Sequence, residues 1–185
     1  MTFTESQRAF VYSQEPFPAF VGGFGSGKTA AGIARIMRLK RYCPYQDVAY
    51  YLPTYPLIED IAFQRFPALF EKNGIPFKLN QQKAVMETEL GRIIFRNMEQ
   101  PDRIVGYEVA HSVVDELDTL PIDKARAGLA LVADDPDAED RAIRLLHALH
   151  VAVAGVLGIG VQHHHRLQRR HDLVAHCVPH VALLF

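Results

Sequence analysis

The sequence has few cysteines and no excess of either charge, and both shortages exclude whole classes of protein. Its two cysteines, Cys43 and Cys177, are too few for a disulfide-rich scaffold and too far apart for a cysteine-based metal motif. Lysine and arginine number 20 against 21 aspartates and glutamates, so the formal net charge is -1. A polybasic protein is therefore excluded, and any contact with nucleic acid must come from a local patch.

Long apolar runs are missing as well. The first nine residues lack the basic and apolar segments of a signal peptide. The run from Ala148 to Val161 has 14 residues and includes His150, whereas a membrane-spanning helix needs about 20 residues. No membrane association is therefore expected. The composition, 49% hydrophobic and 22% charged, is that of a soluble globular protein.

A third shortage divides the chain near residue 126. Ser, Thr, Asn, Tyr, Lys and Met supply 30 of the first 125 residues and none of the last 60, and eight of the nine histidines follow residue 126. We predict an incomplete domain over residues 1–125 and an anomalous tail over residues 126–185, irregular or helical, that is not part of the fold. Three interpretations of the tail compete: out-of-frame translation of a GC-rich gene, a genuine His-rich module behind a linker, and a membrane segment. No site residue is expected there, because no acidic partners or regular spacing mark the histidines as metal ligands.

Helical and strand patterns alternate before residue 126. Thr4 fits an N-cap for a helix over residues 4–13, and apolar residues recur at helical spacing over residues 28–42 and 56–70. This alternation predicts an α/β sheet with helices on its faces. Short apolar runs predict buried strands at residues 17–21, 47–52 and 109–114, and a hairpin is predicted from residues 84–89 and 92–96. The basic side chains of the second helix, which are Arg35, Arg38, Lys40 and Arg41, are expected on a solvated face.

The strongest motif is GGFGSGKT at residues 22–29, directly after a predicted strand and opening a predicted helix. It satisfies G-x-x-x-x-G-K-[ST], the pattern of a phosphate-binding loop. Glycines let the main chain curl so that its N–H groups face phosphate oxygens, and the following helix adds its N-terminal dipole. Lys28 would reach the β and γ phosphates, and the Thr29 hydroxyl would ligate Mg²⁺. The motif predicts binding of ATP with Mg²⁺, and a chance glycine loop is the alternative. The residues expected to contact the phosphates are Gly22, Gly23, Gly25, Ser26, Gly27, Lys28 and Thr29.

An acidic pair follows the last predicted strand of this domain. In the run Val113-Val114-Asp115-Glu116, an aspartate at the end of a buried strand can hold the Mg²⁺ shell. The adjacent Glu116 can act as the general base that activates water. A solvated turn cluster is the alternative, because Asp118 follows closely.

Four other side chains could belong to the site. Gln7, or else Gln14, offers a donor and an acceptor that suit the adenine edge, with a surface glutamine as the alternative. Arg103 could neutralise phosphate charge, contact DNA, or be a solvated loop residue. His111 is expected to be a core residue rather than a catalytic one.

Taken together, these motifs resemble the ATPase domain of the large subunit of tailed-phage terminases. Their order and spacing match over residues 4–124. The phosphate loop and acidic pair are shared with many ATPases. The distinctive parts are the GGxGSGKT form of the loop and the segments RIIFR and RIVGYE, which precede the acidic pair. The segments that carry the resemblance are TESQ (4–7), GGFGSGKT (22–29), YYLPTY (50–55), RIIFR (92–96), RIVGYE (103–108) and VVDE (113–116).

The resemblance implies a P-loop NTPase of the RecA-like type, with a mainly parallel sheet flanked by helices. It implies a motor that packages double-stranded DNA into a procapsid, working as a homo-oligomer on the portal protein with a small terminase subunit, in the cytoplasm of the host bacterium. It assigns catalysis to Lys28 and Glu116, metal binding to Thr29 and Asp115, and nucleotide binding to the loop and Gln7. The family's C-terminal nuclease is expected to be absent from 185 residues.

The sequence departs from this family in two further places. Many members carry a basic residue at the position of Phe24, which cannot act on phosphates. No Ser or Thr occurs after Thr119, so the family's Ser/Thr-rich coupling segment is missing. Two rival functions stay open: another DNA-dependent ATPase such as a helicase, and a non-catalytic remnant that binds nucleotide without turning it over.

Overall fold

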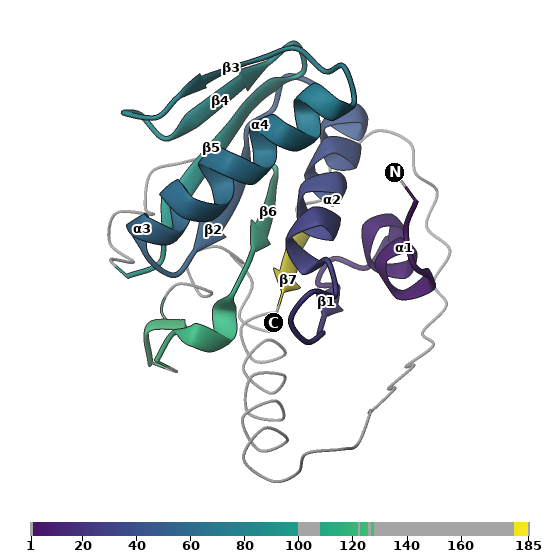
Figure 1. The fold of residues 1–185 in the computed structure, drawn as a ribbon, viewed down its shortest axis with the longest axis vertical. Coiled ribbons are helices and arrows are strands. Elements are labelled where there is room, and N and C mark those ends of the chain that lie inside the picture. Colours follow the sequence, from purple (N-terminus) through teal and green to yellow (C-terminus); the bar gives the residue numbers. More distant parts are fainter. Residues whose placement is uncertain (1, 100–107, 122, 126, 128–179, 185) are drawn as a thin grey trace, which may run out of the picture.

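The described residues form one seven-stranded sheet, and its strand order differs from the chain order. The computed structural model describes residues 2–99, 108–121, 123–125, 127 and 180–184. Across the sheet the order is β1-β7-β6-β2-β5-β4-β3 (Figure 1). The first five of these strands are mutually parallel, while β4 and β3 are added antiparallel at one edge. The strands are β1 (Ala19–Phe20), β2 (Val48–Leu52), β3 (Phe77–Asn80), β4 (Val85–Thr88), β5 (Gly91–Asn97), β6 (His111–Val114) and β7 (His180–Leu184).

The helices begin and end close to where the sequence signals lie. Helix α1 (Glu5–Tyr12) opens on a capping box, in which Thr4 and Gln7 each bond the other's main chain. Helix α2 (Lys28–Tyr42) has the predicted bounds and starts immediately after the glycine loop. The single helix predicted over residues 56–70 is instead three pieces: α3 (Tyr55–Leu57), the π-helical turn η1 (Ile58–Ala62) and α4 (Phe63–Lys72). Pro67 lies inside α4 and cannot donate to the carbonyl of Phe63, yet the helix continues through it to Lys72.

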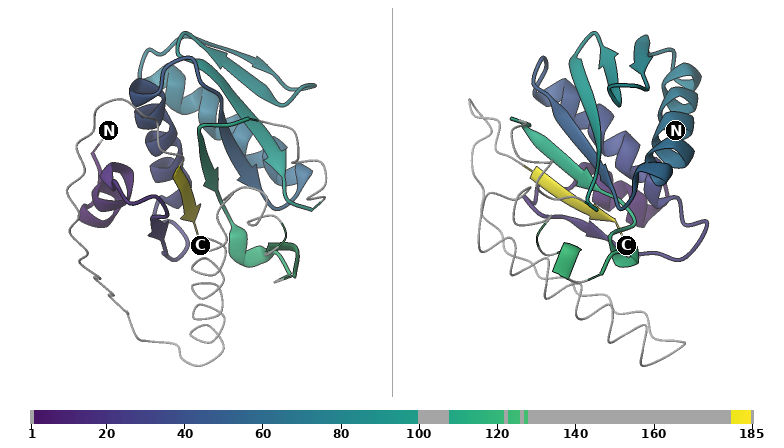
Figure 2. Two further views of the ribbon diagram at one scale, coloured as in Figure 1. Left: turned by 180° about the vertical axis from the view of Figure 1, so that it is seen from behind. Right: turned by 90° about the vertical axis from the view of Figure 1, so that its left-hand side faces the viewer.

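Helices α1, α2 and α4 lie on the same face of the sheet, as the edge-on view in Figure 2 shows. Alternate residues of β2 point to opposite faces, so Val48, Tyr50 and Leu52 join the larger core under these helices. Ala49 and Tyr51 join a smaller cluster on the other face, together with the short helix η3 (Leu117–Thr119). Every residue of β2 is therefore buried, as expected for a central parallel strand.

Two basic residues of α2 correct an expectation. Arg35 and Lys40 were expected on a solvated face, yet both are buried. Arg35 Nη1 donates to the carbonyl oxygens of Phe10 at 2.7 Å and Ser13 at 3.1 Å, which ties the C-terminal end of α1 to α2. Burial is the main reason that the pKa of Arg35 falls to about 10.

The end of the chain also departs from its prediction. Strand β7 lies between β1 and β6 and is parallel to both, with Leu183 aligned to Ala19 on one side and to Val114 on the other. These five residues belong to the sheet, although the whole tail was expected to lie outside the fold. Residues 128–179, and with them the predicted irregular or helical character of the tail, lie outside the described residues. The predicted division near residue 126 stays a prediction.

None of the helices in the described ranges combines the length and the apolar character that crossing a membrane requires.

Candidate functional site

The loop between β1 and α2 takes a conformation that only glycine adopts easily at two positions. Gly25 and Gly27 have φ angles of 77° and 78°, in the left-handed region. Space is restricted too, because a Cβ on Gly27 would lie 2.4 Å from Gln7 Nε2, and one on Gly22 would lie 2.6 Å from Ser26 Oγ. Glycine is therefore favoured at position 27 by backbone geometry and a close contact, and at position 22 by a close contact alone.

Lys28 is the first residue of α2, and its side chain folds back over the loop. Its Nζ donates to the carbonyl oxygen of Gly22 at 2.6 Å and to that of Gly23 at 3.4 Å. The ammonium group is thus held beside the main chain of residues 22–28, where the N-terminus of a 15-residue helix favours anions.

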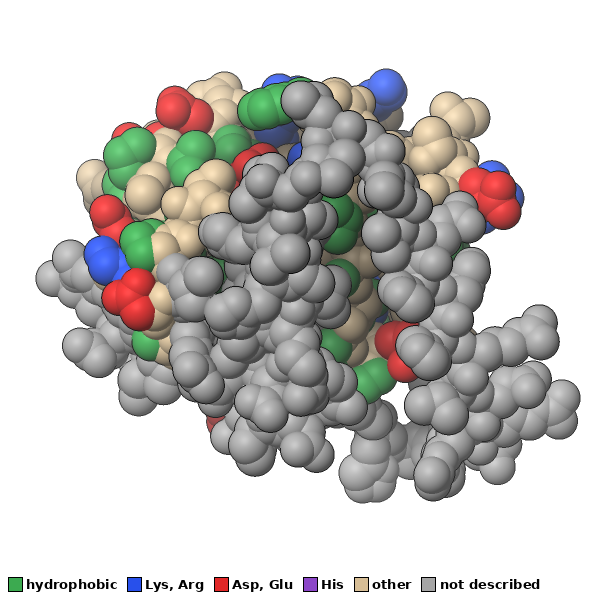
Figure 3. Space-filling model, turned by 90° about the horizontal axis from the view of Figure 1, so that it is seen from below, with side chains coloured by type: hydrophobic (Ala, Val, Ile, Leu, Met, Phe, Trp, Pro, Cys, Tyr) green, Lys and Arg blue, Asp and Glu red, His purple; other side chains and the backbone are tan. Residues whose placement is uncertain are grey.

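Thr29 and Asp115 are 86 positions apart in the sequence and meet at this loop. The Thr29 hydroxyl donates to Asp115 Oδ2 at 3.0 Å. The meeting follows from the topology, because β1 and β6 are parallel and the loop and the acidic pair both lie beyond their carboxyl ends. Ligands of open α/β sheets bind at this edge. Figure 3 views the molecule from below, and the described side chains that are visible there are mostly hydrophobic or uncharged, with a few charged ones among them.

Asp115 is fully buried and accepts two more hydrogen bonds. The Tyr50 hydroxyl donates to Oδ2 at 2.5 Å, and the main-chain N–H of Glu116 donates to Oδ1 at 3.0 Å. Burial raises the pKa of Asp115, while the hydrogen bonds and the charge of Lys28 oppose that rise. The same burial, together with the carboxylate, raises the pKa of Tyr50 well above its usual value, so Tyr50 remains a proton donor.

Glu116 has a backbone conformation that is uncommon for a residue with a side chain. Its φ and ψ are 56° and 35°, in the left-handed region, which costs on the order of 1–3 kcal/mol. Its pKa is raised, first by partial burial and then by the charge of Asp115, whereas Lys28 acts in the opposite direction. This turn separates the two carboxylates, because Asp115 stays in the core while Glu116 is only half-buried.

Gln7 is brought to the loop, and its amide already has partners. Its Nε2 donates to the carbonyl oxygen of Ser26 at 2.7 Å, and its Oε1 accepts from the Thr4 N–H at 3.0 Å. Gln7 therefore links the start of α1 to the glycine loop. Binding of the adenine edge by Gln7 stays a prediction.

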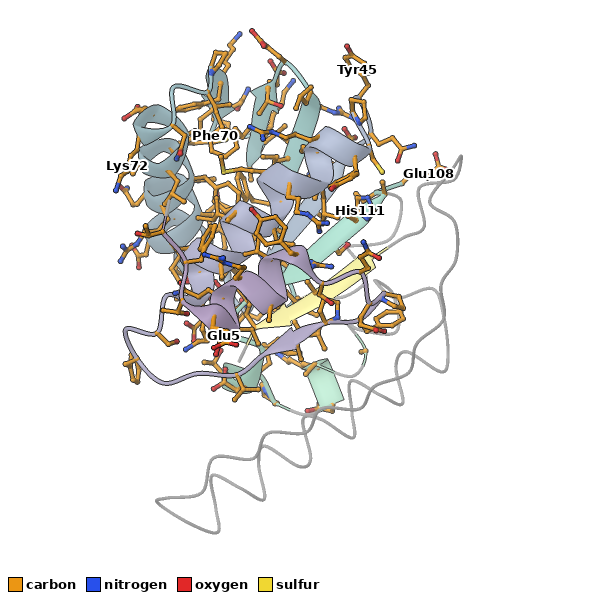
Figure 4. The ribbon with its side chains drawn as sticks, turned by 90° about the vertical axis from the view of Figure 1, so that its right-hand side faces the viewer. Glu5, Tyr45, Phe70, Lys72, Glu108 and His111 are labelled. Atoms are coloured by element: carbon orange, nitrogen blue, oxygen red, sulfur yellow. The ribbon has the colours of Figure 1, made fainter. Side chains whose placement is uncertain are left out.

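Two other candidates, Gln14 and His111, do not join the site. Gln14 is exposed, and Arg103 lies outside the described residues. Phe24, at the tip of the glycine loop, is fully exposed. His111 is buried at the start of β6, at the far end of that strand from Asp115, and its Nε2 lies 3.2 Å from the Cys43 sulfur (Figure 4).

A groove of about 510 Å³ lies at the opposite edge of the sheet. Its lining includes Tyr45, Asp47, Arg92 and Glu108, which lie where the parallel strands begin. Arg92 and Asp47, which are neighbours in this lining, form an ion pair. Because the glycine loop and the acidic pair lie at the other edge, we do not assign this groove to the same site.

The side-chain oxygens at the glycine loop suit Mg²⁺, but they are too few to hold a metal ion without further ligands. The Thr29 hydroxyl and the Asp115 carboxylate are hard oxygen donors, which Mg²⁺ prefers. Within the described ranges no group of three or more His, Cys, Asp or Glu could hold a metal ion. A metal here would therefore need further oxygens from phosphate or water, as Mg²⁺ sites commonly use.

Sequence reasoning missed Tyr50 as part of this site. The signal was its type and place: a tyrosine in a strand that reads as fully buried needs a partner for its hydroxyl. The identity of that partner depends on the pairing of β2 with β6, which the sequence does not show.

Comparison with known proteins gives the fold. No protein-family model and no curated protein sequence matches the chain. Among solved structures, the large terminase of a thermophilic bacteriophage aligns with a TM-score of 0.61 at 14% identity, over 71% of this chain and 36% of that one. A structure of the same protein in complex with ADP aligns at 0.57 and 14%, over 70% and 36%. The ATPase domain of the large terminase of Thermus phage P74-26 aligns at 0.55 and 16%, over 80% and 61%.

These likenesses confirm the predicted fold class, an α/β fold with a mainly parallel sheet flanked by helices, which this chain shares with the large terminase structures. The chain spans only 36% of the length of the first of these proteins.

Proposed function

We propose that this chain is the ATP-binding and ATP-hydrolysing motor domain of a phage terminase large subunit, and that it powers packaging of double-stranded DNA into a procapsid. One observation carries the proposal: the Thr29 hydroxyl at the start of α2 donates to Asp115 at the end of β6. This contact brings the glycine loop and the acidic pair together, as binding of ATP with Mg²⁺ would need. The fold, shared with large terminase structures that include an ADP complex, supports it.

Each residue of the site has a role in this proposal. Main-chain N–H groups of residues 22–27 and the head of α2 hold the phosphates, and Lys28 exchanges its bonds to Gly22 and Gly23 for phosphate oxygens. Thr29 and Asp115 hold Mg²⁺, which when bound neutralises phosphate charge. Glu116 accepts the proton of the attacking water, a role that its raised pKa suits. Gln7 contacts the adenine edge.

The partners follow from the same proposal. They are double-stranded DNA, the portal protein, the small terminase subunit and further copies of this chain arranged on the portal, in the cytoplasm of an infected bacterium. A near-neutral chain needs a local basic patch to contact DNA.

The test is a steady-state ATPase assay on the full chain, with and without double-stranded DNA. We expect Mg²⁺-dependent turnover that DNA stimulates, and we expect Lys28→Ala to abolish nucleotide binding or turnover. Turnover of Lys28→Ala at the wild-type rate would refute the role given to the loop.

A second candidate function is a domain that binds nucleotide without turning it over. The missing Ser/Thr-rich coupling segment after Thr119 favours it, and so does the apolar Phe24 at a position where many members of the resembling family have a basic residue. This candidate predicts no release of phosphate in the same assay, with or without DNA, although a separate binding measurement would show tight binding of ATP.

A further inference from the structure

Tyr50 is a fully buried residue of β2 whose ring and hydroxyl contact different parts of the protein. The ring packs edge-on against Phe66 of α4, with 4.9 Å between the ring centroids. The hydroxyl donates to Asp115 Oδ2 at 2.5 Å. The same oxygen accepts the Thr29 hydroxyl at 3.0 Å, so one carboxylate oxygen joins three elements of the fold.

We propose that Tyr50 is a positioning residue for Asp115, and that its hydroxyl holds the carboxylate in the orientation that receives Thr29. The proposal rests on the function proposed above, in which Thr29 and Asp115 hold Mg²⁺. It adds a residue to which neither the sequence motifs nor the comparisons assign a role.

The backbone around this pair is rigid, which makes such positioning effective. Tyr50 aligns with Val113 in the parallel pairing of β2 with β6, two residues before Asp115. The Asp115 N–H donates to the carbonyl oxygen of Tyr51 at 2.9 Å, so the pairing continues one residue past the strand. The two side chains therefore meet from adjacent main-chain segments that cannot shift independently.

The carboxylate itself is the part that needs fixing. Rotation of an aspartate carboxylate about its terminal bond is soft and broadly distributed. Here the Glu116 N–H holds Oδ1, while Tyr50 and Thr29 hold Oδ2. Without the Tyr50 hydroxyl, only Thr29 would orient Oδ2, and Thr29 is the side chain that has to bind the metal. Groups that orient metal-holding side chains in this way typically change metal affinity or activity by 10- to 100-fold when removed.

The experiment compares Tyr50→Phe with Tyr51→Phe in the full chain. Both remove a buried tyrosine hydroxyl from β2, but Tyr51 lies on the opposite face of the strand. Binding of a fluorescent ADP derivative is measured without Mg²⁺ and across a Mg²⁺ titration. We expect wild-type ADP affinity without Mg²⁺ in both variants, and a Mg²⁺ midpoint raised on the order of 10-fold in Tyr50→Phe alone.

Three other outcomes would each overturn the positioning role of Tyr50. A Mg²⁺ midpoint in Tyr50→Phe equal to that of the wild type overturns the positioning role, even if thermal unfolding shows a loss of stability. An equal rise in both variants overturns it as well. A wild-type chain that binds ADP with no dependence on Mg²⁺ overturns the proposed function itself, and this inference with it.

A second measurement covers the case in which Tyr50→Phe does not fold. Replacing Tyr50 by 3-fluorotyrosine keeps both ring and hydroxyl and provides a ¹⁹F resonance. That resonance should shift when Mg²⁺ is added to the ADP-bound chain and should not shift when ADP is added alone. A resonance that does not respond to Mg²⁺ overturns the proposal.

Discussion

The substitution Gly27→Ala perturbs the glycine loop at its most constrained point. An alanine there would have to adopt a φ of 78°, and its Cβ would lie 2.4 Å from Gln7 Nε2. The left-handed conformation costs roughly 1–2 kcal/mol for a residue with a side chain. Displacing Gln7 also breaks its 2.7 Å bond to the carbonyl of Ser26, which contributes about 1 kcal/mol. We therefore expect the free energy of unfolding to fall by about 2–3 kcal/mol.

The assay is thermal unfolding of the full chain, with Gly23→Ala as the matched control. Gly23 lies in the same loop, has no positive φ, and a Cβ there would meet nothing within 4 Å. For a chain of this size the expected loss lowers the unfolding midpoint by about 4–12 °C. In a Gln7→Ala background the contact with Gln7 is gone, so Gly27→Ala should then retain only the backbone part of its effect. Equal midpoints for Gly27→Ala and Gly23→Ala would refute the loop geometry on which this reasoning depends.

Three further predictions concern the acidic turn and the last strand. Glu116→Gln should keep nucleotide binding and stop turnover, which phosphate-release kinetics would measure; hydrolysis at the wild-type rate would remove Glu116 as the base. Because the pKa of Glu116 is raised above 4.5, the folded chain holds that proton more tightly than the unfolded chain, so stability should fall as pH rises through the window just above 4.5. Urea titrations across that window should show that the free energy of unfolding depends less on pH in Glu116→Gln than in the wild type. An equal pH dependence in the two chains would contradict the raised pKa of Glu116. Leu184→Ala, in the strand between β1 and β6, should lower stability by about 2–5 kcal/mol, and a neutral effect in the same titrations would mean that β7 is not part of the sheet.

Local patterns were enough to predict the glycine loop, the helix behind it and the buried strand before the acidic pair. The bounds of α2 matched because its apolar spacing, its preceding glycines and Pro44 after its end are all adjacent in the sequence. Thr29 and Asp115 were both expected to bind Mg²⁺, and their side chains do meet, because parallel strands bring their carboxyl ends to the same edge.

The features that sequence reasoning missed depend on pairing between distant segments. Tyr50 reads as one more apolar strand residue until β2 is paired with β6. Arg35 reads as a surface cation because its partners are main-chain carbonyls of α1, which no sequence pattern marks. Strand β7 was missed for a similar reason: the composition of the tail is anomalous, but five residues at its end, four of them apolar, pair between β1 and β6.

The central claim is that the loop at residues 22–29 and the acidic pair at residues 115–116 together hold a nucleoside triphosphate with Mg²⁺. Amide chemical-shift mapping of the isotope-labelled chain, titrated with ATP-γ-S and Mg²⁺, tests it most directly. The account predicts that the largest shifts fall in residues 22–29 and 115–116. Shifts confined to the opposite edge of the sheet, around Tyr45 and Arg92, or no shifts at all, would contradict it.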